Sequence, residues 1–206
     1  MLLIQSYFPE IDHIQRSRFL KLTEILPILN QRVNVISRRD IGSLEEKHIL
    51  HSLSIAKKFS FPGGSEVIDV GTGGGFPGIP LAILFPEAQF TLVDSVEKKI
   101  RLVRELIAAL GLRNVMAIRG RMEKMELVAD FVVSRAVTHL VQLERWTRHL
   151  IRPGQVSEMP NGLICLKGGD LAQELEPFSE RTRIYPISDW FDEPFFSTKK
   201  IVYLKK

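Results

Sequence analysis

The densest group of residues that could do chemistry lies in the stretch Glu66–Gly78. An alternating pattern there places one carboxylate ahead of three glycines: Asp69, Gly71, Gly73 and Gly75. Clustered glycines permit a tight turn that brings backbone amides close to a ligand. The β-branched run Val67–Val70 before the turn predicts a strand, and Ile79–Phe85 after it predicts a helix. The stretch therefore predicts a strand, a ligand-binding turn and a helix.

Two ligand classes use such a turn, dinucleotides and adenosyl compounds. The spacing of Gly73, Gly75 and Gly78 also fits a dinucleotide motif, but a pyrophosphate needs free N–H donors at the helix start, and Pro77 removes one. The Asp69 carboxylate would repel a pyrophosphate. S-adenosylmethionine carries an ammonium and a sulfonium and no phosphate, so the acid favours this methyl donor.

A second candidate ligand group stands at the end of the next predicted strand. Phe90–Val93 leads into Asp94, about twenty residues beyond the glycines, where an acid can accept hydrogen bonds from both ribose hydroxyls. Nicotinamide and adenosylmethionine sites share this role, so Asp94 alone does not separate them. The alternative is structural, with the glycines forming a tight turn and Asp94 capping the next helix.

The elements that position these residues must come from a chain of modest size. Its 206 residues and 45% apolar content fit one medium domain, or one domain with a small extension. Its apolar runs are too short to span a bilayer, and one cysteine, Cys165, agrees with a reducing compartment, so we expect a cytoplasmic protein. The scattered histidines suggest no metal site. A net charge of +4 permits an anionic partner without requiring one.

The N-terminal third predicts helices. Residues 11–33 have apolar positions at helical spacing, with Pro27 expected to kink or divide the segment. Ser43–Glu46 has the pattern of a capping box and predicts a second helix that continues to Ala56. A turn cluster at residues 61–64 follows. We therefore expect a helical cap over residues 1–62 and a catalytic domain over residues 63–206.

From residue 65 onward, short apolar runs alternate with helical periodicity, which is typical of an α/β fold with a parallel sheet and crossover helices. Seven strands are predicted: 67–70, 90–93, 115–118, 131–133, 163–166, 181–187 and 199–204. Helices are predicted after the glycine turn, from Val96 to Gly111, from His139 to Ile151 and, as a short segment, before Pro177. Ligands of such sheets bind at the carboxyl ends of the parallel strands.

Two further strand ends add candidates to this site. After the third strand, Met122 can pack on an adenine face and Glu123 can meet its polar edge, although Glu123 also suits an exposed helix start. At the end of the fourth strand, Arg135 opens toward the donor's methyl group. A cation there must pair with a carboxylate or face an anionic substrate, and the residues alone leave both open.

Several motifs together resemble one family. They are Asp69–Leu81, Leu92–Ser95, Ser134–Val137 and Leu166–Gly169, and the match extends to the helical part at Asn34–Ile36 and His48–Leu53. The chain resembles the bacterial 16S rRNA guanine-N7 methyltransferases, also called glucose-inhibited division protein B. The resemblance implies a Rossmann-like class I methyltransferase fold and S-adenosylmethionine-dependent methylation of N7 of one guanine in 16S rRNA, within the 30S subunit or an assembly intermediate.

By position, the resemblance puts donor contacts on a set that overlaps the one found above: Gly71, Phe76, Met122, Glu123 and Arg135. The chain departs from the family pattern at Lys47 and His51, which bears on RNA contacts from the helical part, and at Met122. Three alternatives remain open: a methyltransferase for a protein or small molecule, a nicotinamide-dependent oxidoreductase, and a ribosome-binding protein without catalysis.

The implied reaction suits a sparse site. Guanine N7 has an in-plane lone pair and loses no proton before attack, so no general base is required, and none is convincing in the sequence. Arg135 is the candidate catalytic residue, as a positioning group that contacts O6 of the guanine or a nearby phosphate.

Overall fold

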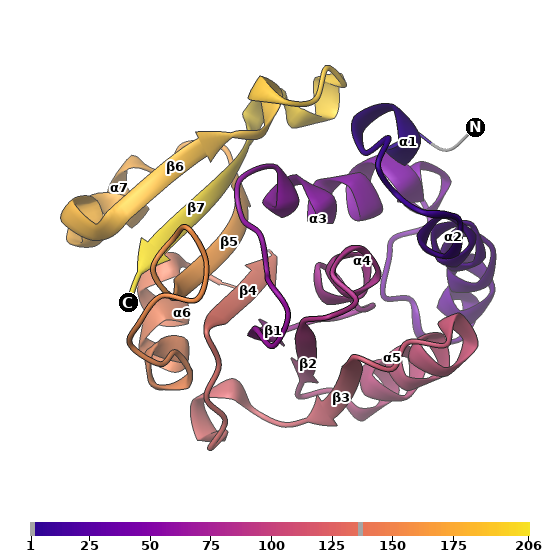
Figure 1. Ribbon diagram of the computed structural model, residues 1–206, viewed down its shortest axis with the longest axis horizontal. Helices are drawn as coiled ribbons and strands as arrows, with labels where there is room; N and C mark the ends of the chain where they lie inside the picture. Colours follow the sequence, from indigo (N-terminus) through magenta and orange to yellow (C-terminus); the bar gives the residue numbers. More distant parts are fainter. Residues whose placement is uncertain (1–2, 136–137) are drawn as a thin grey trace.

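A seven-stranded, mostly parallel sheet runs through the computed structural model, which describes residues 3–135 and 138–206 (Figure 1). Ala136 and Val137, which end one of the family motifs, lie outside the described residues. The strand order is β3-β2-β1-β4-β5-β7-β6, with β1 to β5 parallel and β7 antiparallel to both neighbours. The predicted α/β fold class is confirmed.

All seven predicted strands are present within one or two residues at most ends. They are β1 Glu66–Val70, β2 Gln89–Asp94, β3 Val115–Arg119, β4 Phe131–Arg135, β5 Gly162–Gly168, β6 Thr182–Pro186 and β7 Lys199–Lys205. The α-helices are α1 Ile4–Tyr7, α2 His13–Val33, α3 His51–Leu53, α4 Gly78–Leu84, α5 Glu97–Leu110, α6 Leu140–Thr147 and α7 Ala172–Leu175. Shorter helical turns are η1 Ile41–Ser43, η3 Ser54–Lys57, η4 Met122–Lys124, η5 Arg148–Leu150, η6 Glu176–Arg181, η7 Ile187–Asp189 and η8 Pro194–Thr198, and η2 Glu45–Leu50 is a π-helix.

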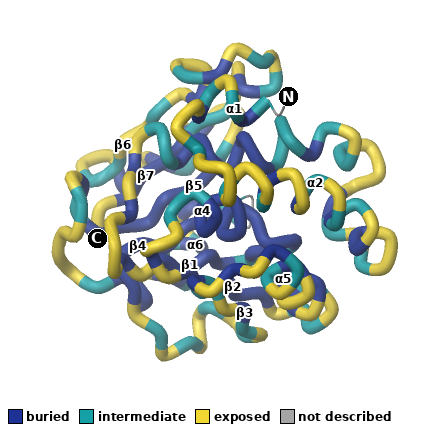
Figure 2. Tube along the Cα trace, turned by 45° about the vertical axis from the view of Figure 1, so that its right-hand side comes forward, coloured by how far each residue is buried: buried dark blue, intermediate teal, exposed yellow. Residues whose placement is uncertain are grey.

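Helices cover both faces of the sheet because alternate strand residues point to opposite sides. In β1, Val67 packs in the apolar cluster with α4 and α5, whereas Ile68 packs with α6 and α7. Figure 2 shows β1, β2, β4 and β5 in the buried centre of the molecule. Cys165 lies in the second cluster, where burial raises the pKa of its thiol to about 12, so it is a core residue.

The N-terminal helices lie against α4 and α5, on one side of the sheet (Figure 1). The apolar cluster that contains Val67 also contains Phe19 and Leu22 of α2, so one core runs through both predicted parts. The division at residues 62 and 63 therefore stays a prediction. Pro27 lies inside α2 and does not divide it. Among the described residues, no helix combines the length and apolarity needed to cross a bilayer.

The capping box predicted at Ser43 is wrong. Ser43 forms no cap hydrogen bond, because the backbone is already helical at Asp40 and Leu44 and leaves no extended N-cap residue. The Glu45 carboxylate instead accepts a hydrogen bond from the Ile4 amide at 3.0 Å. The segment continues as the π-helix η2, a form that often marks functional sites.

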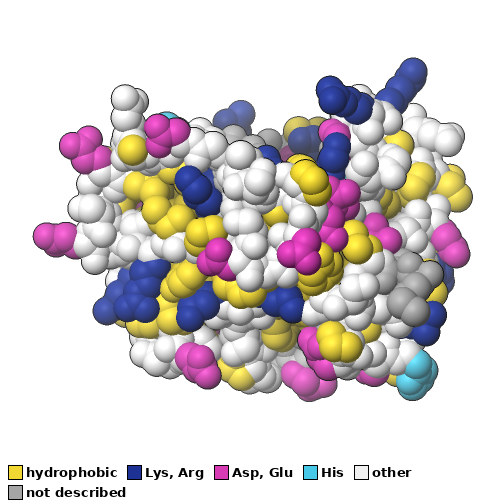
Figure 3. Space-filling view, turned by 90° about the horizontal axis from the view of Figure 1, so that it is seen from above, with side chains coloured by type: hydrophobic (Ala, Val, Ile, Leu, Met, Phe, Trp, Pro, Cys, Tyr) yellow, Lys and Arg dark blue, Asp and Glu magenta, His cyan; other side chains and the backbone are white. Residues whose placement is uncertain are grey.

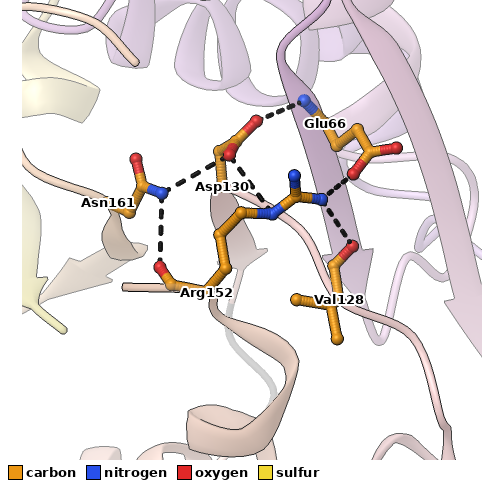
Figure 4. A network of polar contacts seen from close by, with 5 residues as sticks. All are labelled: Glu66, Val128, Asp130, Arg152 and Asn161. Carbon is orange, nitrogen blue, oxygen red and sulfur yellow. Dashed lines mark hydrogen bonds and ion pairs between the residues drawn. The ribbon is translucent and has the colours of Figure 1, made fainter. Parts of the chain in front are cut away.

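A polar network joins the amino-terminal ends of the parallel strands, here called the amino edge of the sheet (Figure 4). Asp130, directly before β4, accepts a hydrogen bond from the Glu66 amide at 2.8 Å and one from the Asn161 side chain at 3.4 Å. Arg152 pairs with the carboxylates of Asp130 and Glu66 and donates to the Val128 carbonyl at 3.2 Å. Each of these three charges thus has a partner of opposite sign at this edge.

Candidate active site

A cavity of about 380 Å³ lies at the carboxyl-terminal ends of the parallel strands, here called the carboxyl edge of the sheet. Five of the predicted site residues line it: Gly71, Asp94, Met122, Glu123 and Arg135. Its volume falls in the range of small-molecule sites. The parallel strands therefore bring together residues that are up to 64 positions apart in the chain, as the strand-end rule predicts.

The glycine turn and Asp94 are joined by hydrogen bonds. Gly73 has a positive φ of 60°, which turns its amide toward the Asp94 carboxylate at 3.1 Å. The Lys99 ammonium lies 3.6 Å from the same carboxylate oxygen, Oδ2, and the other oxygen, Oδ1, accepts a hydrogen bond from the Val96 amide at 2.9 Å. Asp94 therefore does both things considered above: it organises the start of α5, and it keeps acceptor capacity toward the cavity.

Asp69 lies outside the cavity lining, fully buried beneath the turn. Its Oδ2 accepts hydrogen bonds from the Thr72 hydroxyl at 2.6 Å and the Gly78 amide at 2.8 Å. Burial raises the pKa of this carboxyl to about 7, against the lowering effect of those bonds. A Cβ on Gly78 would lie 2.8 Å from Oδ2, so only glycine fits there. Asp69 thus braces the turn, and the Gly78 amide that a pyrophosphate would need is already bonded.

Phe76 is buried behind Arg135 and supports its guanidinium. The Arg135 Cζ atom lies 5.0 Å from the centroid of the Phe76 ring, a cation–π distance. The His48 ring meets the same phenylalanine edge-on, with centroids 5.5 Å apart. Phe76 therefore contributes to the site through Arg135, and it is not among the residues that line the cavity.

Arg135 is bonded only to neutral groups. Its Nη2 lies 3.0 Å from Nδ1 of His48, and its Nη1 donates to the Lys47 carbonyl at 3.4 Å; both acceptors belong to η2. Among the described residues no carboxylate lies within ion-pair distance of it. Burial lowers the pKa of Arg135 to about 10, with the nearby Asp69 opposing the shift, so the group remains a cation at neutral pH.

The neutral state of His48 makes this contact possible. Burial, and then the charge of Arg135, lower the pKa of His48 to about 4. At neutral pH its Nδ1 can therefore accept the hydrogen bond from Arg135, which assigns the ring proton to Nε2. The cap thus supplies an acceptor for a side chain at the end of β4, a contact across 87 residues that the sequence pattern did not reveal.

The far wall of the cavity contains the predicted adenine residues and one that was not predicted. Met122 and Glu123 lie on η4, after β3, and Glu123 is 3.8 Å from Arg121. Trp146 of α6 also lines the cavity. Its position near the end of an amphipathic helix gave no sign of this, because the helix after β4 could be placed only approximately. Within the described part of the chain, no three His, Cys, Asp or Glu side chains are placed to hold a metal ion.

The family of the chain follows from its similarity to known proteins. A family model described as GidB, rRNA small subunit methyltransferase G, matches residues 15–188. The chain belongs to this family. A protein of Bacteroides fragilis named ribosomal RNA small subunit methyltransferase G is 50% identical over 204 residues, covering 99% of both chains, and one of Bacteroides thetaiotaomicron is 51% identical over 203 residues, covering 98% of both.

Solved structures share the fold at low sequence identity. A SAM-dependent methyltransferase from Aquifex aeolicus has a TM-score of 0.57 at 19% identity, over 82% of this chain and 98% of that one. A SAM-dependent O-methyltransferase from Thermotoga maritima has a TM-score of 0.59 at 15% identity, over 81% and 69%. The predicted family and methyltransferase activity are confirmed, with S-adenosylmethionine as the methyl donor and small-subunit rRNA as the substrate class. The oxidoreductase alternative does not hold.

Proposed function

We propose that this enzyme transfers the methyl group of S-adenosylmethionine to N7 of one guanine in 16S rRNA. The substrate would be the 30S subunit or an assembly intermediate, and the enzyme would act in the cytoplasm. One observation carries the proposal: a cavity suited to an adenosyl compound ends at a cation, Arg135, that no carboxylate in the described structure neutralises.

The residues of the cavity fit the donor. The Asp94 carboxylate has acceptor positions left for ribose hydroxyls after its two backbone bonds. Met122 and Trp146 offer apolar surface for the adenine, and Glu123 offers an acceptor for its amino group. Gly71 lines the cavity through backbone alone, and Gly73 and Asp69 hold the turn in shape. When bound, the donor supplies an electrophilic methyl group.

The acceptor chemistry asks little of the protein beyond position. The N7 lone pair attacks the methyl carbon directly, and no proton leaves the guanine, so a general base has no task. Asp69, whose pKa burial raises to about 7, lies buried below the turn and out of the cavity. Holding the nucleophile in line can contribute roughly 7–11 kcal/mol to the barrier reduction. Arg135, held by the cap, would contact O6 or a phosphate and so fix the base.

The experiment that tests this function follows one labelled methyl group. The enzyme is incubated with labelled S-adenosylmethionine and 30S subunits, or naked 16S rRNA, from a strain that lacks this methylation. Aniline then cleaves the RNA at N7-methylguanine. Label at a single cleavable guanine is expected. Donor binding without label in RNA would contradict the proposed acceptor and direct the search to a protein or small molecule.

A further inference from the structure

Beside the donor cavity, the ammonium groups of two lysines lie over one aromatic ring, and the backbone carbonyl of one of these lysines accepts from Arg135. We call this group the acceptor-side cluster: Lys47 and His51 from the cap, Arg135 from β4, Phe195 from η8 and Lys199 from β7. Neither lysine lines the donor cavity, and Arg135 belongs to both. The cluster therefore borders the cavity without forming part of the adenosyl pocket.

The cluster is held together around Phe195. The ammonium of Lys199 lies 4.9 Å from the centroid of the Phe195 ring, and that of Lys47 lies 5.9 Å from it. Both distances are within cation–π range. His51 meets the ring edge-on, with centroids 5.4 Å apart. The Lys47 carbonyl accepts from Arg135 at 3.4 Å, which connects the ring and its lysines to the end of β4.

The charges of the cluster are not balanced. Lys47 has one acidic partner, Asp40, at 3.1 Å. Arg135 and Lys199 have none among the residues that the structure describes. Burial lowers the pKa of His51 to about 3, and Arg135 and Lys199 are the next largest causes, which is consistent with two cations close to one imidazole. Three cations with one carboxylate repel one another, so an anion placed among them would be stabilised.

Lys199 lies at the carboxyl edge of the sheet, where the donor cavity also lies. Lys199 pairs with Gly168 at the carboxyl end of β5, and Arg135 pairs with Leu166 one strand away. Neighbouring strands are about 4.8 Å apart, so the two backbones lie about 10 Å apart across the sheet. The neighbouring lysine at this edge, Lys167, is neutralised by Glu174. The next lysine of β7, Lys200, donates to the Gly169 carbonyl at 3.0 Å. Lys199 thus shares with Arg135 the lack of a carboxylate partner among the described residues.

The net charge of the chain is small, so a group of unpaired cations is a local feature of its surface. On the face shown in Figure 3, Lys and Arg side chains lie in separate groups with Asp and Glu side chains between them. A ligand drawn by charge alone would therefore find few concentrated sites, and a cluster with two unpaired cations next to the catalytic cavity would be one of them.

We propose that Lys199, together with Lys47 and Arg135, binds a backbone phosphate of the rRNA strand that carries the acceptor guanine. This inference rests on the proposed function for the identity of the acceptor. A phosphate oxygen can take hydrogen bonds from both ammonium groups and from the guanidinium. Phe195 positions the lysines, because their ammonium groups already lie over its ring. The contact fixes the strand beside the methyl donor and carries no base specificity.

The test compares two lysines of one strand. Lys199→Gln removes the proposed contact, and Lys205→Gln removes the same charge six residues along β7, on the same side of the strand but at its far end. For each variant we would measure binding to 30S subunits at several salt concentrations, methylation, and the affinity for S-adenosylhomocysteine. Lys199→Arg, which keeps the charge, controls for folding and packing.

Lys199→Gln is expected to weaken 30S binding and raise the KM for 30S about tenfold. The slope of log affinity against log salt should become shallower by about 0.7 to 0.9, the contribution of one phosphate. Affinity for S-adenosylhomocysteine should not change, and Lys205→Gln and Lys199→Arg should resemble the unaltered enzyme. Equal salt slopes and equal 30S affinity for Lys199→Gln and Lys205→Gln would overturn the inference. Binding that depends on Lys199 without methylation would instead overturn the proposed function and leave the phosphate contact standing.

Discussion

Two arginines at opposite edges of the sheet are held in contrasting ways. At the amino edge, Arg152 lies between the carboxylates of Glu66 and Asp130, and every charge has a partner. At the carboxyl edge, Arg135 is surrounded by a carbonyl, a neutral imidazole and an aromatic ring. Both side chains are fixed by several contacts. Only Arg135 has no carboxylate partner among the described residues, so its charge is available to a ligand.

The difference separates an arginine that stabilises the fold from one that we propose to serve the reaction. A paired charge in a network contributes to stability mainly because removing one partner leaves the other uncompensated. A buried cation without a carboxylate costs desolvation free energy, and such groups concentrate at functional sites. We therefore expect substitutions at the amino edge to change stability and substitutions at the carboxyl edge to change activity.

The largest expected effect is at the amino edge. Asp130→Ala leaves the Glu66 amide and the Asn161 side chain without their acceptor and removes a partner of Arg152. The free energy of unfolding should fall by about 3 kcal/mol. Denaturant unfolding measures this, and methylation per folded molecule should not change. Glu66→Ala, at an exposed carboxylate, is the control and should cost less than about 1 kcal/mol. Equal losses from both variants would contradict a network centred on Asp130.

The converse test is Arg135→Gln. Loss of the cation should lower kcat/KM for rRNA methylation about 100-fold, equivalent to about 2.7 kcal/mol of transition-state stabilisation. The free energy of unfolding should stay within about 1 kcal/mol, because the desolvation cost of the charge disappears with its contacts. A large loss of stability with normal methylation would reverse the comparison and make Arg135 a structural residue.

A smaller effect is expected in the pH dependence of stability. The pKa of His51 in the folded chain, about 3, lies below its ordinary value of 6.5. Between these values the unfolded chain binds a proton that the folded chain does not, so this residue lowers stability as the pH falls below 6.5. Its contribution between pH 6.5 and pH 5 should be about 2 kcal/mol. Its ring packs against Phe195 and Phe196, and the charged groups near it, Arg135 and Lys199, lower its pKa further.

The measurement must separate His51 from other titrating groups. His48 has a lowered pKa and acts in the same direction, whereas Asp69 has a raised pKa, to about 7, and stabilises the folded chain as the pH falls below 7. Unfolding curves of the unaltered chain and of His51→Leu at pH 7, 6 and 5 give the difference that belongs to His51. We expect the free energy of unfolding of the unaltered chain to fall relative to that of His51→Leu as the pH falls from 7 to 5. Parallel curves would show that His51 titrates normally.

The two halves of the active site differ in how far the sequence predicted them. The donor half depends on local features: a glycine turn directly after a strand, and Asp94 at the next strand end. Backbone rules place these residues, and the structure brings them together as expected, although Asp69 braces the turn from below it. The proposed acceptor side, around Arg135, depends on a contact with His48, which is 87 residues away in the chain. No periodicity encodes such a contact.

The incorrect prediction at Ser43 has the same origin. The capping-box pattern is a local signal, but the contact of Glu45 with Ile4 and the π-helical path of η2 are tertiary features that override it. Trp146 was missed for a related reason, since its place in the cavity follows from how α6 packs and not from its neighbours in sequence. The proposed acceptor side depends on how η2 packs against the end of β4, which no local pattern in the sequence encodes.

The smallest expected effect comes from removing the hydrogen bond between His48 and Arg135. His48→Phe keeps a ring against Phe76 but removes the Nδ1 acceptor, leaving the Arg135 Nη2 without that partner. Methylation should fall about tenfold, or about 1.4 kcal/mol, as expected for one hydrogen bond to a charged group. His48→Asn, whose side-chain oxygen can accept, should recover part of the loss.

The pH profile of this pair tells a positioning role from a packing role. Because the pKa of His48 is lowered to about 4, the unaltered enzyme should keep this contact from pH 8 down to pH 6, and His48 should add no inflection near 6.5. His48→Phe should lower activity by the same factor throughout that range. A defect that vanished near pH 6 would mean that the unaltered His48 is protonated there and already unable to accept from Arg135. The cap would then position the cation through the Lys47 carbonyl and Phe76 alone.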